Sequence, residues 1–211
     1  MIKLVSKYFP ELTVVQIEKL ISLYELFTTH NKNINLVSKN SLNNFYVEHV
    51  LHSLSICKIN IFNDEELVID VGTGGGFPGI PLAIVYPNTQ FILIDSIAKK
   101  TIMIEKFKNE LSIKNIKIIN DRIEKLNLSC DFIVSRAVTN MNKFLNLIKK
   151  ISFSNKNGYK LFYLKGGDLK NELKGISHKS IEISNFYDED FFNEKKIICI
   201  DKKTIFSHKS K

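Results

Sequence analysis

The chain has 211 residues, enough for one α/β domain with a full core and a small appendage. With 44% hydrophobic and 25% charged residues it has the composition of a globular protein, and no apolar run approaches the roughly 20 residues of a membrane span. Charges and Pro10 interrupt the first residues, and three cysteines are scattered without a metal-ligand spacing. We therefore expect a cytoplasmic protein without a signal peptide, disulfides or membrane contact.

The net charge of +8 is concentrated in one segment. Between Thr139 and Ser180 nine lysines stand against Asp168 and Glu172, a net +7. A basic segment on an otherwise balanced chain indicates a polyanionic partner such as nucleic acid. The alternative is a solvated face, because lysine is common throughout the chain.

The first 62 residues predict a helical extension packed on the core. Thr13 and Gln16 have the spacing of a capping box, and they precede apolar residues at helical spacing as far as Phe27. The Asn-rich residues 30–39 predict a connection, and residues 43–56 a second helix.

Residues 63–211 predict a doubly wound α/β domain. Short apolar strands alternate with amphipathic helices, which is typical of a parallel sheet covered on both faces. The expected strands are 67–71, 91–95, 116–120, 131–135 and 159–164, and the expected helices are 79–86, 98–111, 140–152 and 168–175. Residues 180–186 and 195–201 then follow each other without a helical pattern and predict an antiparallel closing pair.

A glycine-rich loop follows the first strand of this domain. Glycines at 72, 74, 75, 76 and 79 let the backbone take positive φ and let a ligand approach the bare peptide. At the carboxyl edge of a doubly wound sheet, such a loop predicts a nucleotide-like ligand. The spacing of Gly74, Gly76 and Gly79 also satisfies the dinucleotide pattern, and a tight turn without a ligand is the remaining alternative.

Two acidic residues favour S-adenosylmethionine over NAD. Asp70 precedes Gly72-x-Gly74-x-Gly76 in the order typical of enzymes that use S-adenosylmethionine, and its carboxylate can order the loop. Pro78 and Pro81 remove amide donors that a pyrophosphate would need. Asp95 ends the next strand, where it can accept hydrogen bonds from ribose hydroxyls or cap the next helix. The predicted fold class is a Rossmann-like class I S-adenosylmethionine-dependent methyltransferase, with a mostly parallel seven-stranded sheet and an antiparallel closing strand.

Several segments resemble the RsmG (GidB) family over nearly the whole chain. They are DVGTGGGFPGIPLAIVYP, ILIDS, NDRIEKL, SRAV and FYLKGG, together with NINLVSKNSLNNFYVEHVLHSL near the amino terminus. The resemblance implies transfer of a methyl group from S-adenosylmethionine to N7 of a guanine in the 530 loop of 16S ribosomal RNA. The implied partner is that RNA, the small ribosomal subunit or an assembly intermediate, and we expect a monomer. A methyltransferase acting on another RNA or a small molecule, and a non-catalytic RNA-binding module, are the alternatives.

Site residues follow from the resemblance and from the loop. Cofactor contacts are expected at Gly72, Gly74, Gly76, Phe77, Asp95, Ile123, Glu124 and Arg136. Contacts to RNA at the rim of the site are expected at Arg122, Lys165, Lys99 and Lys100. Lys165, at the end of its strand, is expected to reach solvent. Guanine N7 carries a lone pair and no proton, so no general base and no metal are expected, and Arg136 is assigned to positioning. A surface ion pair is the alternative for Arg136.

The chain departs from the family pattern Arg-His-x-x-Asp-Ser in one place. Glu48 and His52 stand where that pattern has Arg and Asp, which puts any RNA contact or ion pair of that Arg in doubt. His49 and His52 have the spacing of a metal pair, but two histidines without a third ligand favour packing.

Overall fold

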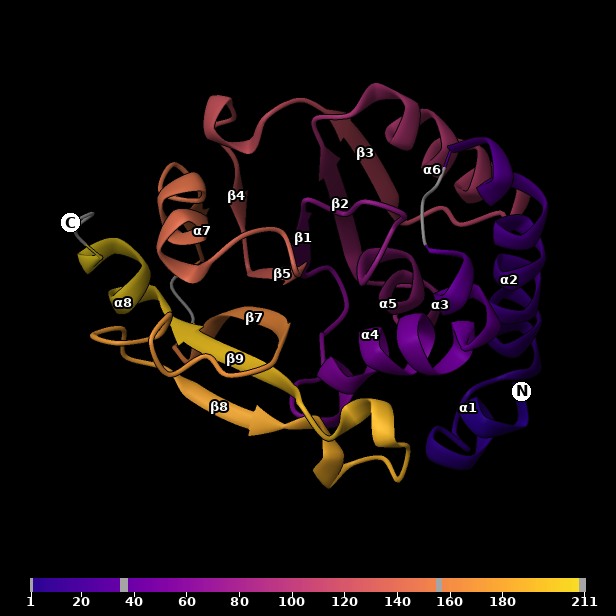
Figure 1. Cartoon of the computed structure of the whole chain (residues 1–211). Helices are drawn as coiled ribbons and strands as arrows, with labels where there is room; N and C mark the ends of the chain where they lie inside the picture. The colour runs from indigo at the N-terminus through magenta and orange to yellow at the C-terminus, as the bar shows by residue number, and fades with distance from the viewer. Residues whose placement is uncertain (1, 35–37, 155–156, 209–211) are drawn as a thin grey trace.

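A seven-stranded sheet forms the centre of the protein, for which a computed structural model describes residues 2–34, 38–154 and 157–208 (Figure 1). Its strands are β1 (Leu67–Val71), β2 (Gln90–Asp95), β3 (Ile116–Asn120), β5 (Phe132–Arg136), β7 (Tyr159–Gly166), β8 (Lys179–Glu182) and β9 (Lys195–Asp201). They lie in the order β3-β2-β1-β5-β7-β9-β8, and β9 runs antiparallel to both of its neighbours. The remaining pairs are parallel, so the predicted fold class is confirmed.

Helices cover both faces of the sheet. They are α1 (Ile2–Tyr8), α2 (Val14–Ile34), α3 (Lys39–Asn43), α4 (His52–Leu54), α5 (Gly79–Val85), α6 (Ala98–Glu110), α7 (Met141–Leu147) and α8 (Lys202–Ser207), and a π-helix at Tyr46–Leu51 precedes α4. The amino-terminal helices gather beside α5 and α6, on the right in Figure 1, while α7 and α8 lie on the left. A two-residue ladder, β4 (Ser129–Cys130) with β6 (Ser152–Phe153), stands beside α7.

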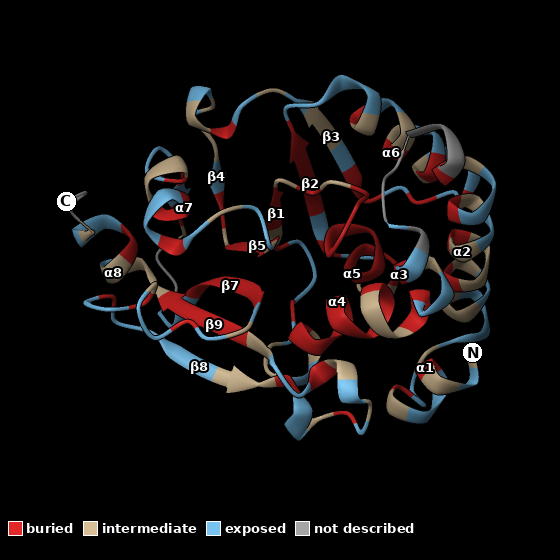
Figure 2. Cartoon of the chain, in the orientation of Figure 1, coloured by how far each residue is buried: buried red, intermediate tan, exposed pale blue. Residues whose placement is uncertain are grey.

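Side chains alternate across the sheet, as expected for strands buried on both faces. In β1, Val68 belongs to the hydrophobic cluster on the side of the amino-terminal helices, whereas Ile69 and Val71 belong to the cluster on the other face. Figure 2 shows the central strands and α5 almost wholly buried. The amino-terminal helices share one continuous cluster with the sheet and with α5. The division at residues 62 and 63 stays a prediction.

The amino-terminal capping box is confirmed. Gln16 N donates to Thr13 Oγ1 at 3.3 Å, and Thr13 N donates to Gln16 Oε1 at 2.9 Å. The helix that begins there runs to Ile34, so the prediction that the connection starts at residue 30 was wrong. The rest of that connection includes residues 35–37, which lie outside the described residues.

Two helices predicted in the second half are shorter or missing. The helix expected over 140–152 ends at Leu147, where the chain turns into β6. No helix forms over residues 168–175: residues 170–175 are turns, in which Leu173 N donates to Leu169 O at 2.9 Å with helical spacing. Gly175, with φ of +79°, ends this segment. Among the described residues, no helix is both long and apolar enough to cross a membrane.

Candidate functional site

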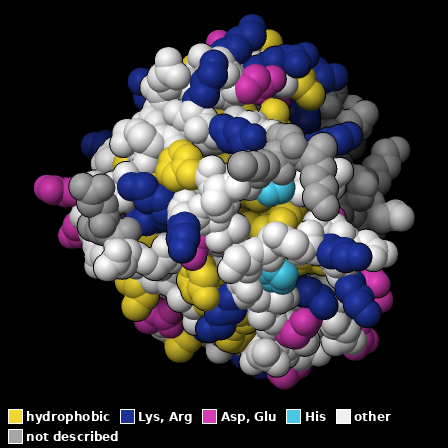
Figure 3. All heavy atoms as spheres, turned by 90° about the vertical axis from the view of Figure 1, so that its left-hand side faces the viewer, with side chains coloured by type: hydrophobic (Ala, Val, Ile, Leu, Met, Phe, Trp, Pro, Cys, Tyr) yellow, Lys and Arg dark blue, Asp and Glu magenta, His cyan; other side chains and the backbone are white. Residues whose placement is uncertain are grey.

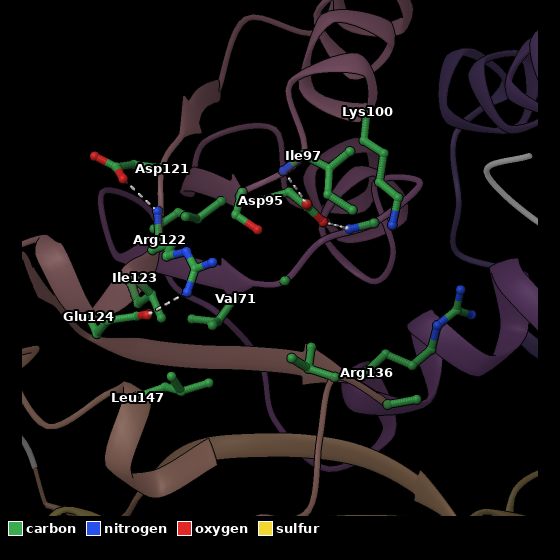
Figure 4. A pocket seen from close by; sticks show the side chains of 16 residues that line it. Val71, Asp95, Ile97, Lys100, Asp121, Arg122, Ile123, Glu124, Arg136 and Leu147 are labelled. Carbon is green, nitrogen blue, oxygen red and sulfur yellow. Dashed lines mark hydrogen bonds and ion pairs between the residues drawn. The ribbon is translucent and has the colours of Figure 1, made fainter. Parts of the chain in front are cut away.

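A cavity of about 620 Å³ opens at the carboxyl ends of the parallel strands (Figure 4). Its volume is within the range of about 300–1,000 Å³ that is usual for small-molecule sites. Eight of the residues predicted for the site line it, namely Gly72, Gly74, Asp95, Lys100, Arg122, Ile123, Glu124 and Arg136. Four others, Gly76, Phe77, Lys99 and Lys165, are not among the lining residues.

Asp70 orders the glycine loop from beneath. Its side chain is fully buried, and Oδ2 accepts hydrogen bonds from Thr73 Oγ1 at 2.6 Å and from Gly79 N at 2.8 Å. A Cβ on Gly79 would stand 2.7 Å from Oδ2, so glycine is required there. Burial raises the pKa of the Asp70 carboxyl to about 7, although the hydrogen bond from Thr73 opposes the shift. The carboxylate thus fixes the loop to the start of α5.

Gly72 and Gly74 present bare peptide to the cavity. Both have positive φ, +70° and +60°, and the ideal Cβ of Gly74 would meet nothing nearer than Gly72 O at 3.9 Å. Gly76 has a different place, because its Cβ would stand 2.3 Å from Ile80 Cδ1. It allows the loop to pack on α5 and does not face the cavity.

Asp95 ties the same loop to the start of α6. It is 8% exposed, with Oδ2 accepting from Gly74 N and Oδ1 accepting from Ile97 N, both at 2.9 Å. Figure 4 shows both bonds converging on this carboxylate. A carboxylate offers about four lone-pair sites. Asp95 therefore caps the start of α6 and still has two acceptor sites for a ligand.

The opposite wall follows β3. Ile123 is buried and provides an apolar surface, while Arg122 and Glu124 lie at the mouth as a loose ion pair of 3.8 Å. Ile97 and Val138, which we did not predict, also line the cavity and are 42% and 39% exposed. Large apolar side chains just beyond strand ends were the signal that could have identified them.

Arg136 does not direct its guanidinium at the cavity. Nη1 donates to Glu48 O at 3.0 Å and Nη2 donates to His49 Nδ1 at 3.1 Å, both in the π-helix. Figure 4 shows this side chain pointing away from Asp95 and Ile123, toward the amino-terminal helices. Burial lowers the pKa of Arg136 to about 10, so the group remains a cation at neutral pH. The surface ion pair that was the alternative is absent from the described contacts.

His49 is a neutral spacer between Arg136 and the loop. Because a guanidinium only donates, Nδ1 accepts and the proton is on Nε2, which lies 3.1 Å from Ser41 Oγ. Burial, and then the charge of Arg136, lower the pKa of His49 to about 3. The ring stacks on Phe77 at 4.9 Å between centroids, and the Arg136 guanidinium lies 4.9 Å from the same ring. Phe77 is therefore clamped from behind the cavity.

The expected exposure of Lys165 was wrong, and the expected packing of His52 is confirmed. Lys165, expected to reach solvent at the rim, is only 9% exposed, and its ammonium donates to Thr139 O at 2.9 Å and pairs with Glu172. This ammonium is buried and already neutralised by a carboxylate, so it is not the exposed cation that was expected at the rim. His52, expected to pack, does so against Phe191 and Phe192, and within the described residues it belongs to no cluster of three possible metal ligands.

The family described as rRNA small subunit methyltransferase G (GidB) has a model that matches residues 16–196. The chain belongs to this family. It is similar to ribosomal RNA small subunit methyltransferase G of Christiangramia forsetii, with 46% identity over 96% of this chain and 98% of the relative. The corresponding protein of Bacteroides fragilis strain YCH46 is 41% identical, over 94% and 91% of the two chains.

Solved structures support the fold alone. An S-adenosylmethionine-dependent methyltransferase from Aquifex aeolicus has a TM-score of 0.56 at 17% identity, covering 78% of this chain and 98% of that one. The predicted family and enzyme class are confirmed: the chain is an rRNA methyltransferase with S-adenosylmethionine as its cofactor. The cavity fits that cofactor, because it combines bare glycine peptide, a carboxylate with spare acceptor sites and an apolar wall.

Proposed function

We propose that this protein methylates N7 of a guanine in the 530 loop of 16S ribosomal RNA. One observation carries the proposal: Asp95, the glycine loop and Ile123 line the same cavity. Ile97, Val138 and cationic side chains line its open mouth. When bound, S-adenosylmethionine supplies an electrophilic sulfonium methyl group. Guanine N7 has a free lone pair, so the residues need only bind, orient and desolvate the base.

Each cofactor residue has a defined task in this proposal. Asp95 accepts hydrogen bonds from the ribose hydroxyls, and Ile123 packs on the adenine with Glu124 beside its amino group. Gly72 and Gly74 let the remaining part of the cofactor lie against the peptide. Gly76 and Phe77 act through the loop, since neither lines the cavity, and Arg136 lines the cavity but directs its guanidinium to the π-helix and to Phe77.

The mouth of the cavity is suited to a splayed-out base. Ile97 and Val138 offer apolar surface, and Lys100 and Arg122 lie at the same rim. Lys99 is exposed one position away and is a second candidate for the RNA backbone. Because N7 lies in the deep groove of an RNA helix, the target guanine must leave its helix to enter. We propose that the protein does this as a monomer in the cytoplasm, where ribosomal RNA is found.

The experiment is transfer of a labelled methyl group from S-adenosylmethionine to 16S RNA and to small subunits, followed by mapping of the modified base. Asp95→Ala should weaken cofactor binding at least tenfold, since two ribose hydrogen bonds of about 1 kcal/mol or more are lost. Arg122→Ala should leave cofactor binding nearly unchanged and weaken RNA binding. Label on another base, or on free guanosine as readily as on RNA, would refute the assignment.

A further inference from the structure

A second cavity, of about 610 Å³, lies on the side of the molecule that carries α7 and α8. We call it the α7–α8 groove: it is formed by α7, by the turn segment after β7 and by α8. These helices are on the left in Figure 1, so Figure 3 looks onto this side, where Lys and Arg side chains are spread over the surface. Neither the family assignment nor the proposed chemistry uses this groove.

Most of the residues that line the groove are polar, and the charged side chains among them are lysines. It includes Lys143 and Lys174, the amides of Asn140, Asn142 and Asn146, and the hydroxyls of Ser177, Thr204 and Ser207. No acidic residue is among the described residues that line it. Sites for small organic ligands are mainly apolar, whereas cations mixed with amides and hydroxyls are the groups that contact phosphates and sugars.

The lysines of residues 139–180 have different environments in the structure. Lys160 and Lys165 are buried, and Lys165 is neutralised by Glu172. Lys143 and Lys174 are exposed in the groove, and neither forms an ion pair within the part of the chain that the structure describes. Lys156 lies outside the described residues. The segment's charge is therefore available to a partner at this groove rather than at Lys165.

The groove and the cofactor cavity share one short helix, α7, and lie on neighbouring sides of it. Leu147 of α7 lines the cofactor cavity, whereas Asn142, Lys143 and Asn146 of the same helix line the groove. A helix with its side chains is about 10–12 Å across, so a strand that places one nucleotide in the cavity can pass over α7 within a few nucleotides.

We propose that the α7–α8 groove binds the sugar–phosphate backbone of the RNA strand that flanks the methylated nucleotide. This inference rests on the proposed function, because that function supplies the RNA and the place of the target base. Lys143 and Lys174 hold phosphates, and the amides and hydroxyls contact backbone and ribose oxygens. The groove contributes affinity and direction of the strand, and takes no part in methyl transfer.

The test compares two double variants, each of which removes two positive charges. Lys143→Ala with Lys174→Ala removes the groove cations, and Lys150→Ala with Lys170→Ala removes two exposed lysines of the same segment outside the groove. Binding of an unstructured oligouridylate and of 16S RNA is measured at several salt concentrations. Two lost phosphate contacts should weaken binding about tenfold near 0.1 M salt and flatten the log–log salt slope by about 1.4. The control pair should change binding less than threefold.

Further readouts separate this inference from its competitors. The dissociation constant of S-adenosylmethionine and the single-turnover rate at saturating RNA should stay unchanged in both pairs. Equal weakening by both pairs would mean a general charge effect and would overturn the proposal. The proposal would also be overturned if Lys143 and Lys174 were needed for saturable binding of inorganic phosphate but not for binding of oligouridylate. Failure of the parent protein to methylate 16S RNA would refute the proposed function, whereas the oligouridylate comparison still decides the groove.

Discussion

Replacing Arg136 by alanine tests whether this residue supports the glycine loop or touches the cofactor. The substitution removes two hydrogen bonds from a cation, each about 1.5–3 kcal/mol, and a cation–π contact of about 0.5–2 kcal/mol. It also leaves His49 Nδ1 and Glu48 O without their donor. Because contributions within one network do not add fully, we expect a loss of about 3–5 kcal/mol in the free energy of unfolding.

Urea unfolding and cofactor titration together give the answer. Arg122→Ala is the control, since its side chain is 69% exposed and its 3.8 Å pair with Glu124 is worth at most about 0.5 kcal/mol. Arg136→Lys should be intermediate, because an ammonium can keep one of the two bonds. An Arg136→Ala protein with unchanged stability and a tenfold weaker cofactor affinity would refute the reasoning. Arg136 would then reach the cofactor directly, as the family resemblance implies.

Two further predictions concern the loop and its titrating groups. In urea unfolding, Gly72→Ala should destabilise the protein more than Gly74→Ala. Both glycines have positive φ, but only a Cβ at Gly72 would clash, at 2.4 Å from Val138 Cγ2. Equal losses of unfolding free energy in the two variants would contradict the clash. Stability should also titrate with opposing slopes. Burial raises the pKa of Asp70 from 3.8 to about 7, so its contribution is complete below pH 3.8 and is lost as pH rises through 7. Burial lowers the pKa of His49 from 6.5 to about 3, so its contribution is complete above pH 6.5 and is lost as pH falls. Burial also lowers the pKa of His52, so Asp70→Asn should reveal a stability that falls from pH 6.5 to 4 by up to about 1.4 kcal/mol per unit for each of the two histidines, and a flat profile would contradict it.

Local patterns predicted the sheet and the loop well because the information lies in neighbouring residues. All five predicted parallel strands are present within a residue or two of their expected ends. The acidic residues at the ends of β1 and β2 both bond to the glycine loop, as the position of strand ends in a parallel sheet requires. Short-range rules of spacing and alternation were sufficient for these features.

The predictions failed where partners distant in sequence decide the environment. Nothing near Lys165 in the sequence shows that Glu172 folds back to meet it, so a lysine at a strand end was taken for a solvent-exposed one. The apolar residues of 168–175 have helical spacing, yet the segment forms turns in which Leu169 and Leu173 are buried. The ion pair between Lys165 and Glu172 and the positive φ of Gly175 stabilise these turns. The direction of Arg136 depends on the π-helix 87 residues away, which no periodicity in its own strand reveals.

The amino-terminal helices therefore belong to the support of the cofactor site. Asp70 and Asp95 hold the loop by hydrogen bonds to its backbone. The His49 ring and the Arg136 guanidinium pack against the Phe77 ring. This arrangement also explains how the chain tolerates Glu48 where the family pattern has Arg. Arg136 bonds to the backbone carbonyl of Glu48, which every residue type provides, so the substitution leaves the support of the loop intact. Loss of the Arg136 guanidinium or of the His49 ring, or a change in the path of the π-helix, would remove this support from Phe77, while Asp70 and Asp95 would still bond to the loop.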